Sequence, residues 1–260
     1  MKTLLLTGGS SGIGLHTVQL FAAKGWTVFE LSRSGKTTQH VTHIDCDVTD
    51  DASIEKAVGE VMQRIDHIDV VISNAGFGIS GPIEFTSTAE AQKQFDVNFF
   101  GAFRLTKAVL PILRKQGRGR IIFTSSVAAD LSIPYQSFYS ASKSALNAMA
   151  LALANEVREF GIRVSVLMPG DVATGFTDAR EKNIHGAEGY KGVHTAVAAM
   201  EKDEQNGMSP RYMARNLYRI ATCISPKPIY VGGAKYKCFC LLNRILPKRL
   251  VNWIVGKLYC

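Results

Sequence analysis

The sequence lacks an apolar run of about 18 residues, so we expect no helix that spans a bilayer. Its start, residues 1–6, has one Lys and a short aliphatic run with glycines directly after it. This pattern predicts a buried strand rather than a signal peptide. No cysteine spacing is of the CxxC zinc type, so we expect no metal site. The five cysteines are read as reduced thiols of a cytoplasmic protein: Cys46, Cys223, Cys238, Cys240 and Cys260.

Acidic residues are missing from the C-terminal fifth of the chain. Residues 206–260 carry 10 Lys/Arg and no Asp or Glu, whereas residues 1–205 carry 20 Lys/Arg against 22 Asp/Glu. The net charge of +8 therefore belongs to the C-terminal segment, at +10, while the remainder stands at −2. This distribution gives little support to nucleic-acid binding by the whole chain.

Internal repeats and low-complexity linkers are also missing, and we predict one domain over residues 1–260. Short aliphatic runs alternate with helical patterns. Strands are predicted at 4–6, 27–32, 41–45, 68–73, 120–125, 163–168 and 229–231. Helices are predicted at about 12–24, 51–64, 90–115 and 139–160. Apolar strands separated by helices indicate an α/β fold, a doubly wound parallel sheet of about seven strands with helices on both faces.

A glycine-rich turn follows the first strand, with the sequence TGGSSGIG at 7–14. Glycines in such a turn allow the backbone to approach a pyrophosphate, which the free N–H groups of the next helix then bind. The motif predicts a Rossmann-type nucleotide site, although an ordinary strand–helix turn is the alternative. The candidate residues are Gly8, Ser10, Ser11, Gly12, Ile13 and Gly14.

The end of the second strand should meet the adenosine ribose. An Asp or Glu there would bind the 2′-hydroxyl of NAD, but this chain has Ser32 and Arg33, with Lys36 close by. A guanidinium can pair with a 2′-phosphate, so NADP(H) is favoured; otherwise Arg33 is a solvated loop cation. Glu30 would share the face of Ser32, so a role for its carboxylate stays open.

Tyr139 and Lys143 are four residues apart on a predicted helix, hence on one face. A nearby ammonium favours the phenolate and lowers the pKa of a tyrosine, which makes the pair a plausible general acid/base. A serine hydroxyl could hold the substrate oxygen beside it.

Together these motifs resemble the short-chain dehydrogenase/reductase family. The matching segments are TGGSSGIG at 7–14, DV at 47–48, NAG at 74–76, Asn98, SS at 125–126, YSASK at 139–143 and PG at 169–170. Ser73 departs from the Asn that is frequent there. The resemblance implies that Tyr139 is the acid/base, that Lys143 lowers its pKa and holds the nicotinamide ribose, and that Ser126 orients the substrate oxygen.

The same resemblance implies further roles. Asn98 would take part in a water-linked proton relay. The remaining cofactor contacts would be Asp47 and Val48 at the adenine, Asn74, Ala75 and Gly76 along the cleft, and Pro169, Gly170, Val172 and Thr174 near the nicotinamide.

The C-terminal part is predicted to supply the substrate side, with residues 171–208 as a lid. Residues 236–260 predict basic amphipathic helices, which could lie on a membrane, cap the pocket or contact another subunit. This tail loosely resembles the retinol and 17β-hydroxysteroid dehydrogenase-like branch of the family, which implies a lipophilic steroid, retinoid or long-chain ketone.

The sequence therefore predicts an NADP(H)-dependent oxidoreductase acting on CH–OH donors, a carbonyl reductase that interconverts a ketone or aldehyde and an alcohol. Its expected partner beyond the substrate is a second copy, as a homodimer or homotetramer. The alternative is a non-catalytic NADP(H) sensor, although such proteins commonly lose the Tyr or the Lys.

Overall fold

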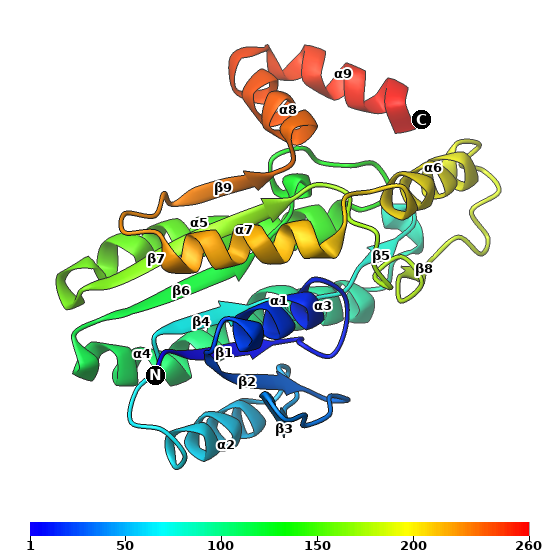
Figure 1. The fold of residues 1–260 in the computed structure, drawn as a ribbon. Coiled ribbons are helices and arrows are strands. Elements are labelled where there is room, and N and C mark those ends of the chain that lie inside the picture. Colours follow the sequence, from blue (N-terminus) through cyan, green and yellow to red (C-terminus); the bar gives the residue numbers. More distant parts are fainter. Residues whose placement is uncertain (260) are drawn as a thin grey trace.

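The computed structural model describes residues 1–259, so Cys260 lies outside the described residues. Its main sheet has seven parallel strands in the order β3-β2-β1-β4-β6-β7-β9 (Figure 1). The strands are β1 Thr3–Thr7, β2 Thr27–Ser32, β3 Val41–Asp45, β4 Val70–Ser73, β6 Gly119–Thr124, β7 Ile162–Pro169 and β9 Ile229–Gly232. The order reverses between β1 and β4, which confirms the doubly wound fold class.

Helices cover both faces of this sheet, because successive strand residues are apolar on both sides. On one face, Leu4 and Leu6 of β1 pack in a cluster with α1 (Gly12–Ala23) and α7 (Pro210–Thr222). On the other face, Leu5 belongs to a larger cluster. The helices α2 (Asp51–Met62), α4 (Gly101–Gln116) and α5 (Ser137–Glu156) contribute to that cluster, and so does Cys240 of α8 (Ala234–Ile245).

The single helix expected over 90–115 is three consecutive segments in the structure. They are α3 (Thr88–Phe95), a π-helical turn (Asp96–Phe100) and α4. The reason is Asn98, whose amide holds the backbone of Phe77 through both its oxygen and its nitrogen. The wider turn brings this buried side chain to the inner side of the helix.

Helices α6 (Val193–Gln205) and α7 and a small second sheet were not predicted from the sequence. Helix α7 packs along α1, and its start carries a usable signal, because Ser209 caps it and Pro210 occupies the first turn. A two-stranded parallel sheet joins β5 (Ile79–Ser80) to β8 (Glu181–Lys182). Two-residue strands have no periodicity from which they could be predicted.

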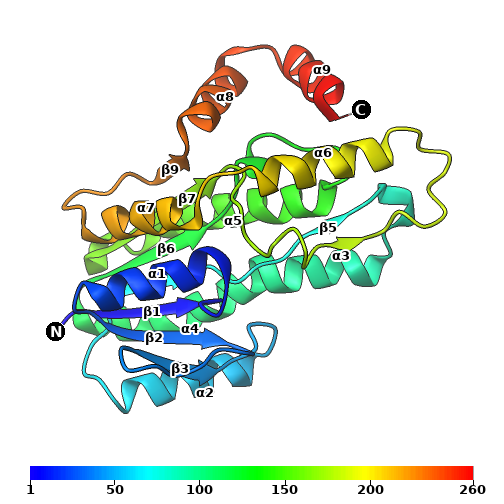
Figure 2. The same ribbon diagram turned by 45° about the vertical axis from the view of Figure 1, so that its right-hand side comes forward.

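The last three elements are the edge strand β9 and the helices α8 (Ala234–Ile245) and α9 (Lys248–Tyr259). Figures 1 and 2 both show α8 and α9 standing outside the α/β body, with the end of α9 toward α6 (Val193–Gln205). Within residues 1–259, no helix has the length and apolar character needed to cross a bilayer.

Candidate active site

A cleft of about 500 Å³ lies at the carboxyl ends of the strands, where the strand order reverses. Among the residues expected to bind the cofactor or to act in catalysis, Gly14 and Asn98 are absent from its lining, as are Glu30 and Lys36 near the ribose end. The structure brings together Gly8, Ser10, Ser11, Gly12, Ile13, Ser32, Arg33, Asp47, Val48, Asn74, Ala75, Gly76, Ser126, Tyr139, Lys143, Pro169, Gly170, Val172 and Thr174. Segments up to about 160 residues apart in the chain thus share one site.

The glycine turn has the shape that a dinucleotide requires. Gly8 has φ +72°, and a Cβ there would stand 2.9 Å from the Cα of Ala75. A Cβ at Gly14 would overlap the carbonyl oxygen of Gly8. Position 14 therefore requires glycine, although Gly14 does not itself line the cleft. The Asn74 amide donates to that same carbonyl at 3.1 Å. The turn is therefore tied to the end of β4 and leaves its outer side open for a phosphate.

The far end of the cleft is formed by the end of β2. The Ser32 hydroxyl is buried and finds no hydrogen-bond partner within residues 1–259, while Arg33 is exposed beside it. Glu30 is committed elsewhere, since its carboxylate accepts from the Gly9 N–H at 3.0 Å and contacts the His43 ring at 2.6 Å. Its role is therefore to hold the glycine turn, and it does not line the cleft.

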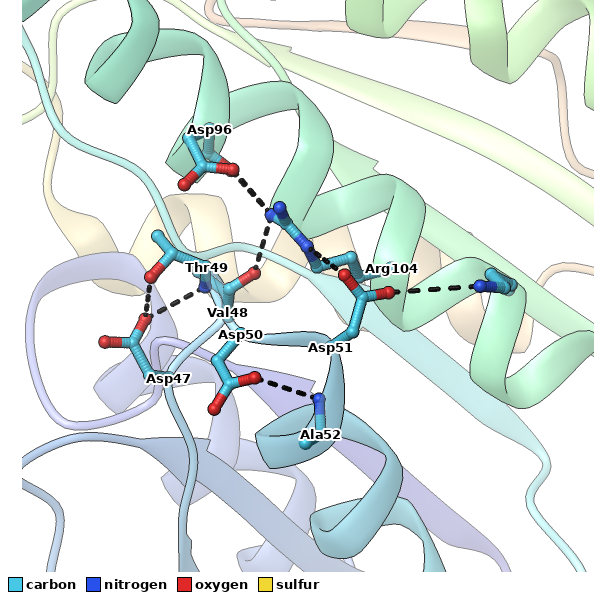
Figure 3. Close-up of polar contacts among 9 residues, drawn as sticks. Asp47, Val48, Thr49, Asp50, Asp51, Ala52, Asp96 and Arg104 are labelled. Atoms are coloured by element: carbon cyan, nitrogen blue, oxygen red, sulfur yellow. Dashed lines mark hydrogen bonds and ion pairs between the residues drawn. The ribbon is translucent and has the colours of Figure 1, made fainter. Parts of the chain in front are cut away.

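The part of the cleft at Asp47 and Val48, where the adenine was expected, is shaped by the loop after β3, which Figure 3 shows in detail. Asp47 accepts hydrogen bonds from the backbone and the hydroxyl of Thr49 at 2.9 and 2.8 Å. Arg104 of α4 donates to the Val48 carbonyl at 3.3 Å and pairs with Asp51 at 3.0 Å and with Asp96 at 2.7 Å. Arg104 is thus a positioning residue, which no sequence motif indicated.

At the reacting end, Tyr139 is hydrogen-bonded to Ser126, and the Lys143 ammonium lies 5.9 Å from the Tyr139 ring centre. Burial raises the pKa of Tyr139 to about 12, an effect that the hydrogen bond with Ser126 only partly opposes. The expected lowering of this pKa is therefore not observed, because desolvation of the phenolate is the larger effect. Burial also lowers the pKa of Lys143 to about 8.

Behind this pair, the backbone carbonyl of Thr124 accepts from the Lys143 ammonium at 3.0 Å. Asn98 lies one layer deeper, with its amide donating to the Phe77 carbonyl at 3.0 Å and to the Ser142 hydroxyl at 3.1 Å. A Cβ at Gly76 would stand 3.1 Å from the Asn98 oxygen and 3.4 Å from the Lys143 nitrogen. The backbone of Gly76, which carries no side chain, therefore lies close to both the Asn98 amide and the Lys143 ammonium.

The segment expected as a lid, residues 171–208, contains side chains for which the sequence predicted no individual role. Phe176 contacts the Tyr139 ring, with 5.7 Å between ring centres, and the Arg180 guanidinium lies 5.5 Å from the Phe176 ring centre. Arg180 is buried and pairs with Glu204, to which the Thr177 hydroxyl also donates at 2.7 Å. This ion pair fixes the segment after β7 against α6, and Glu204 lines the cleft.

The tail reaches the same cleft at two points. Tyr236 of α8 donates to Asp171 at 2.5 Å, and its ring fills the space that a Cβ at Gly170 would occupy. Tyr259, at the end of α9, lines the cleft together with Met200. No group of three His, Cys, Asp or Glu residues within 1–259 has the arrangement of a metal site.

The chain is similar in sequence to known proteins. The family profile described as short chain dehydrogenase matches residues 2–185. A 3-ketodihydrosphingosine reductase of Bacteroides thetaiotaomicron is 39% identical over 265 residues, covering 99% of this chain and 98% of that protein. An uncharacterized oxidoreductase of Escherichia coli, YbbO, is 33% identical and covers 98% of this chain and 94% of its own length.

Solved structures agree with these sequence matches. A short-chain dehydrogenase from Streptomyces avermitilis superposes with a TM-score of 0.84 at 27% identity, covering 99% of this chain and 94% of that chain.

Proposed function

The chain belongs to the short-chain dehydrogenase/reductase family and is an oxidoreductase of that family, and we propose that it interconverts a ketone or aldehyde and an alcohol with NADP(H). The observation that carries this proposal is the meeting of Tyr139, Ser126 and Lys143 at one end of a cleft whose other end is Arg33. The non-catalytic sensor is not favoured, because this acid/base group is intact.

In the direction of reduction, Tyr139 is the general acid. Its raised pKa keeps the phenol protonated at neutral pH, so the proton that the substrate oxygen needs is already present. Ser126, hydrogen-bonded to Tyr139, positions that oxygen. Lys143 is close enough to compensate the phenolate that remains after proton transfer. Asn98 keeps the Phe77 backbone and the floor of the site in place, next to Lys143.

The residues fit a nicotinamide dinucleotide. The bare glycine turn would hold the pyrophosphate, the loop at Asp47 and Val48 the adenine, and residues 169–174 the nicotinamide. When bound, this cofactor supplies or accepts the hydride. The 2′-phosphate of NADP would be met by Arg33 and by the partnerless hydroxyl of Ser32. The competing carboxylate, Glu30, already has two partners.

The substrate we propose is lipophilic, with a long-chain ketone of the sphingoid type as the leading candidate. The 39% identical relative is a 3-ketodihydrosphingosine reductase. Apolar side chains surround the cleft on the substrate side, namely Ile133, Phe176, Met200 and Tyr259. Residues 171–208 would act as the lid, because they carry Phe176, whose ring contacts that of Tyr139, and Met200, which also lines the cleft.

We also propose a homodimer or homotetramer. Large apolar side chains are exposed at Phe100, the last residue of the π-helical turn, at Phe103 in the first turn of α4, and at Leu151 on α5. These positions are separate from the cleft lining, so assembly there would leave the substrate path open.

Tyr139→Phe tests the catalytic proposal. It removes the proton donor, and general acid catalysis contributes about 10²–10⁴-fold, so NADPH oxidation with a long-chain ketone should fall by that factor. NADPH affinity, measured by fluorescence titration, should stay within about 3-fold, because the ring remains. Tyr212→Phe, on the exposed surface of α7, is the matched control. Normal turnover by Tyr139→Phe would refute the assignment.

A further inference from the structure

The outer face of α9 is apolar and uncovered. Leu250, Trp253, Ile254 and Leu258 recur at the spacing of one helix face, and Trp253 is 61% exposed. Large exposed apolar patches on soluble proteins often mark a surface that binds a partner or a membrane. The face belongs to a helix that stands outside the α/β body in both ribbon views (Figure 2).

Helix α8 continues this surface. Leu241, Leu242 and Ile245 lie on one face of α8 and are exposed, Ile245 by 67%. Only Leu246 and Pro247 separate α8 from α9. We name the exposed apolar faces of these two successive helices together the tail surface.

Positive charge surrounds the tail surface, with no negative charge in the same segment. Its helices carry Lys235, Lys237, Arg244, Lys248, Arg249 and Lys257. Residues 206–260 contain no Asp or Glu, so these cations have no acidic neighbour within their own segment. Anionic headgroups would neutralise the charge of such a surface. Contact with a second copy of the tail surface would instead bring like charges together.

The inner faces of the same helices are attached to the body. Cys240 is buried, the Asn243 amide donates to the Asp130 carbonyl at 2.8 Å, and Tyr236 bonds to Asp171. Tyr259, one residue after Leu258, lines the cleft. The helices are thus held with one face toward the substrate cleft and the opposite face outward.

We propose that the tail surface docks on an anionic lipid bilayer and sets the mouth of the cleft, at Tyr259, against the lipid. The apolar side chains would enter the headgroup boundary by about 5–10 Å, with the Lys and Arg side chains at the phosphates. Docking itself is independent of the reaction. The delivery of a long-chain substrate from the bilayer rests on the proposed function.

Vesicle flotation with the full chain tests docking. The vesicles are phosphatidylcholine with about 30% phosphatidylglycerol, or phosphatidylcholine alone, at about 50 and about 500 mM salt. The chain should float with the anionic vesicles at low salt and at least about 10-fold less with the neutral ones. Absence of flotation with anionic vesicles at low salt overturns the proposal.

Paired variants locate the surface. Trp253→Glu should reduce flotation at least about 10-fold, while Ile83→Glu, at a residue 62% exposed on another part of the molecule, should leave it unchanged. Equal flotation by both variants overturns the proposal. So does a wild-type oligomer that Trp253→Glu dissociates without any flotation, because the tail surface would then be a subunit interface.

Turnover separates docking from the reaction. Trp253 does not line the cleft, so Trp253→Glu should reduce a water-soluble ketone at the wild-type rate. With a long-chain ketone dispersed in the vesicles, its rate should fall about 5-fold or more, since the enzyme no longer meets the lipid. An unchanged rate overturns delivery. If the wild type reduces no ketone, the proposed function is wrong. The flotation experiment would still show whether the tail surface docks on the bilayer.

Discussion

Lys143→Met should make the protein more stable while abolishing its activity. Burial lowers the pKa of Lys143 from 10.5 to about 8. Since one pKa unit corresponds to about 1.4 kcal/mol, holding this ammonium costs the folded state roughly 3 kcal/mol at pH 7. Loss of the hydrogen bond to the Thr124 carbonyl offsets about 1 kcal/mol. We therefore expect a net gain of about 2 kcal/mol, or about 4–8 °C in Tm.

The gain should depend on pH in a defined direction. The folded pKa lies below the unfolded one, so the unfolded chain binds more protons between pH 8 and 10.5. The penalty is complete below pH about 8 and disappears as the pH rises toward 10.5. At pH 10 the remaining penalty is about 1 kcal/mol, which the lost hydrogen bond to the Thr124 carbonyl offsets, so the advantage of Lys143→Met over wild type should shrink to roughly zero.

Urea unfolding without added cofactor measures both effects, at pH 7 and at pH 10. Lys56→Met, at an exposed lysine of α2, is the matched control and should change the free energy of unfolding by less than about 0.5 kcal/mol. If Lys143→Met is less stable than wild type at pH 7, or if its advantage is the same at both pH values, the reasoning from burial is wrong.

Two further predictions concern the cofactor end. Arg33→Asp should weaken NADPH binding about 10–100-fold and favour NADH, because a charge-assisted contact to the 2′-phosphate is lost and a carboxylate is gained; fluorescence titration with both nucleotides measures this, and an unchanged preference would point to Lys36. Arg104→Gln should raise the KM for NADPH several-fold and leave kcat within about 2-fold, because the loop at Val48 loses its anchor while Tyr139 is untouched. A fall in kcat alone, in steady-state kinetics, would contradict that role.

The strands and most helices of the sheet were predictable because their apolar residues are buried on both faces, which leaves a strong local pattern. The start of β2 and the end of β3 were predicted to the residue. The turn at Asn98 was not, because the π-helical widening depends on a contact with Phe77, about twenty residues earlier. The hydrophobic periodicity of about 3.6 residues by which a helix is recognised contains no information about a contact with a distant residue.

The residues of the candidate site fall into the same two groups, those found from local sequence patterns and those that depend on contacts between distant segments. Gly8, Ser126, Tyr139 and Lys143 belong to motifs whose spacing is visible in the chain. The pKa of Tyr139 was predicted in the wrong direction, because burial is a property of the folded cleft. Arg104 and Glu204 act through partners on other elements. Nothing in their local sequence distinguishes them from surface charges, so only the structure could reveal them.

The absence of a side chain at Gly170 has a consequence for regulation. The Tyr236 ring occupies the space beside it, so the first turn of α8 lies directly against the segment proposed to hold the nicotinamide. If a partner of the tail shifts this contact, its binding and nucleotide binding would be thermodynamically linked. Linkage is reciprocal, so the factor by which a nucleotide changes the affinity of the tail for its partner equals the factor by which that partner changes the affinity for the nucleotide. The tail would then regulate nucleotide binding, and two titrations, of nucleotide with and without the partner and of the partner with and without nucleotide, should give the same factor.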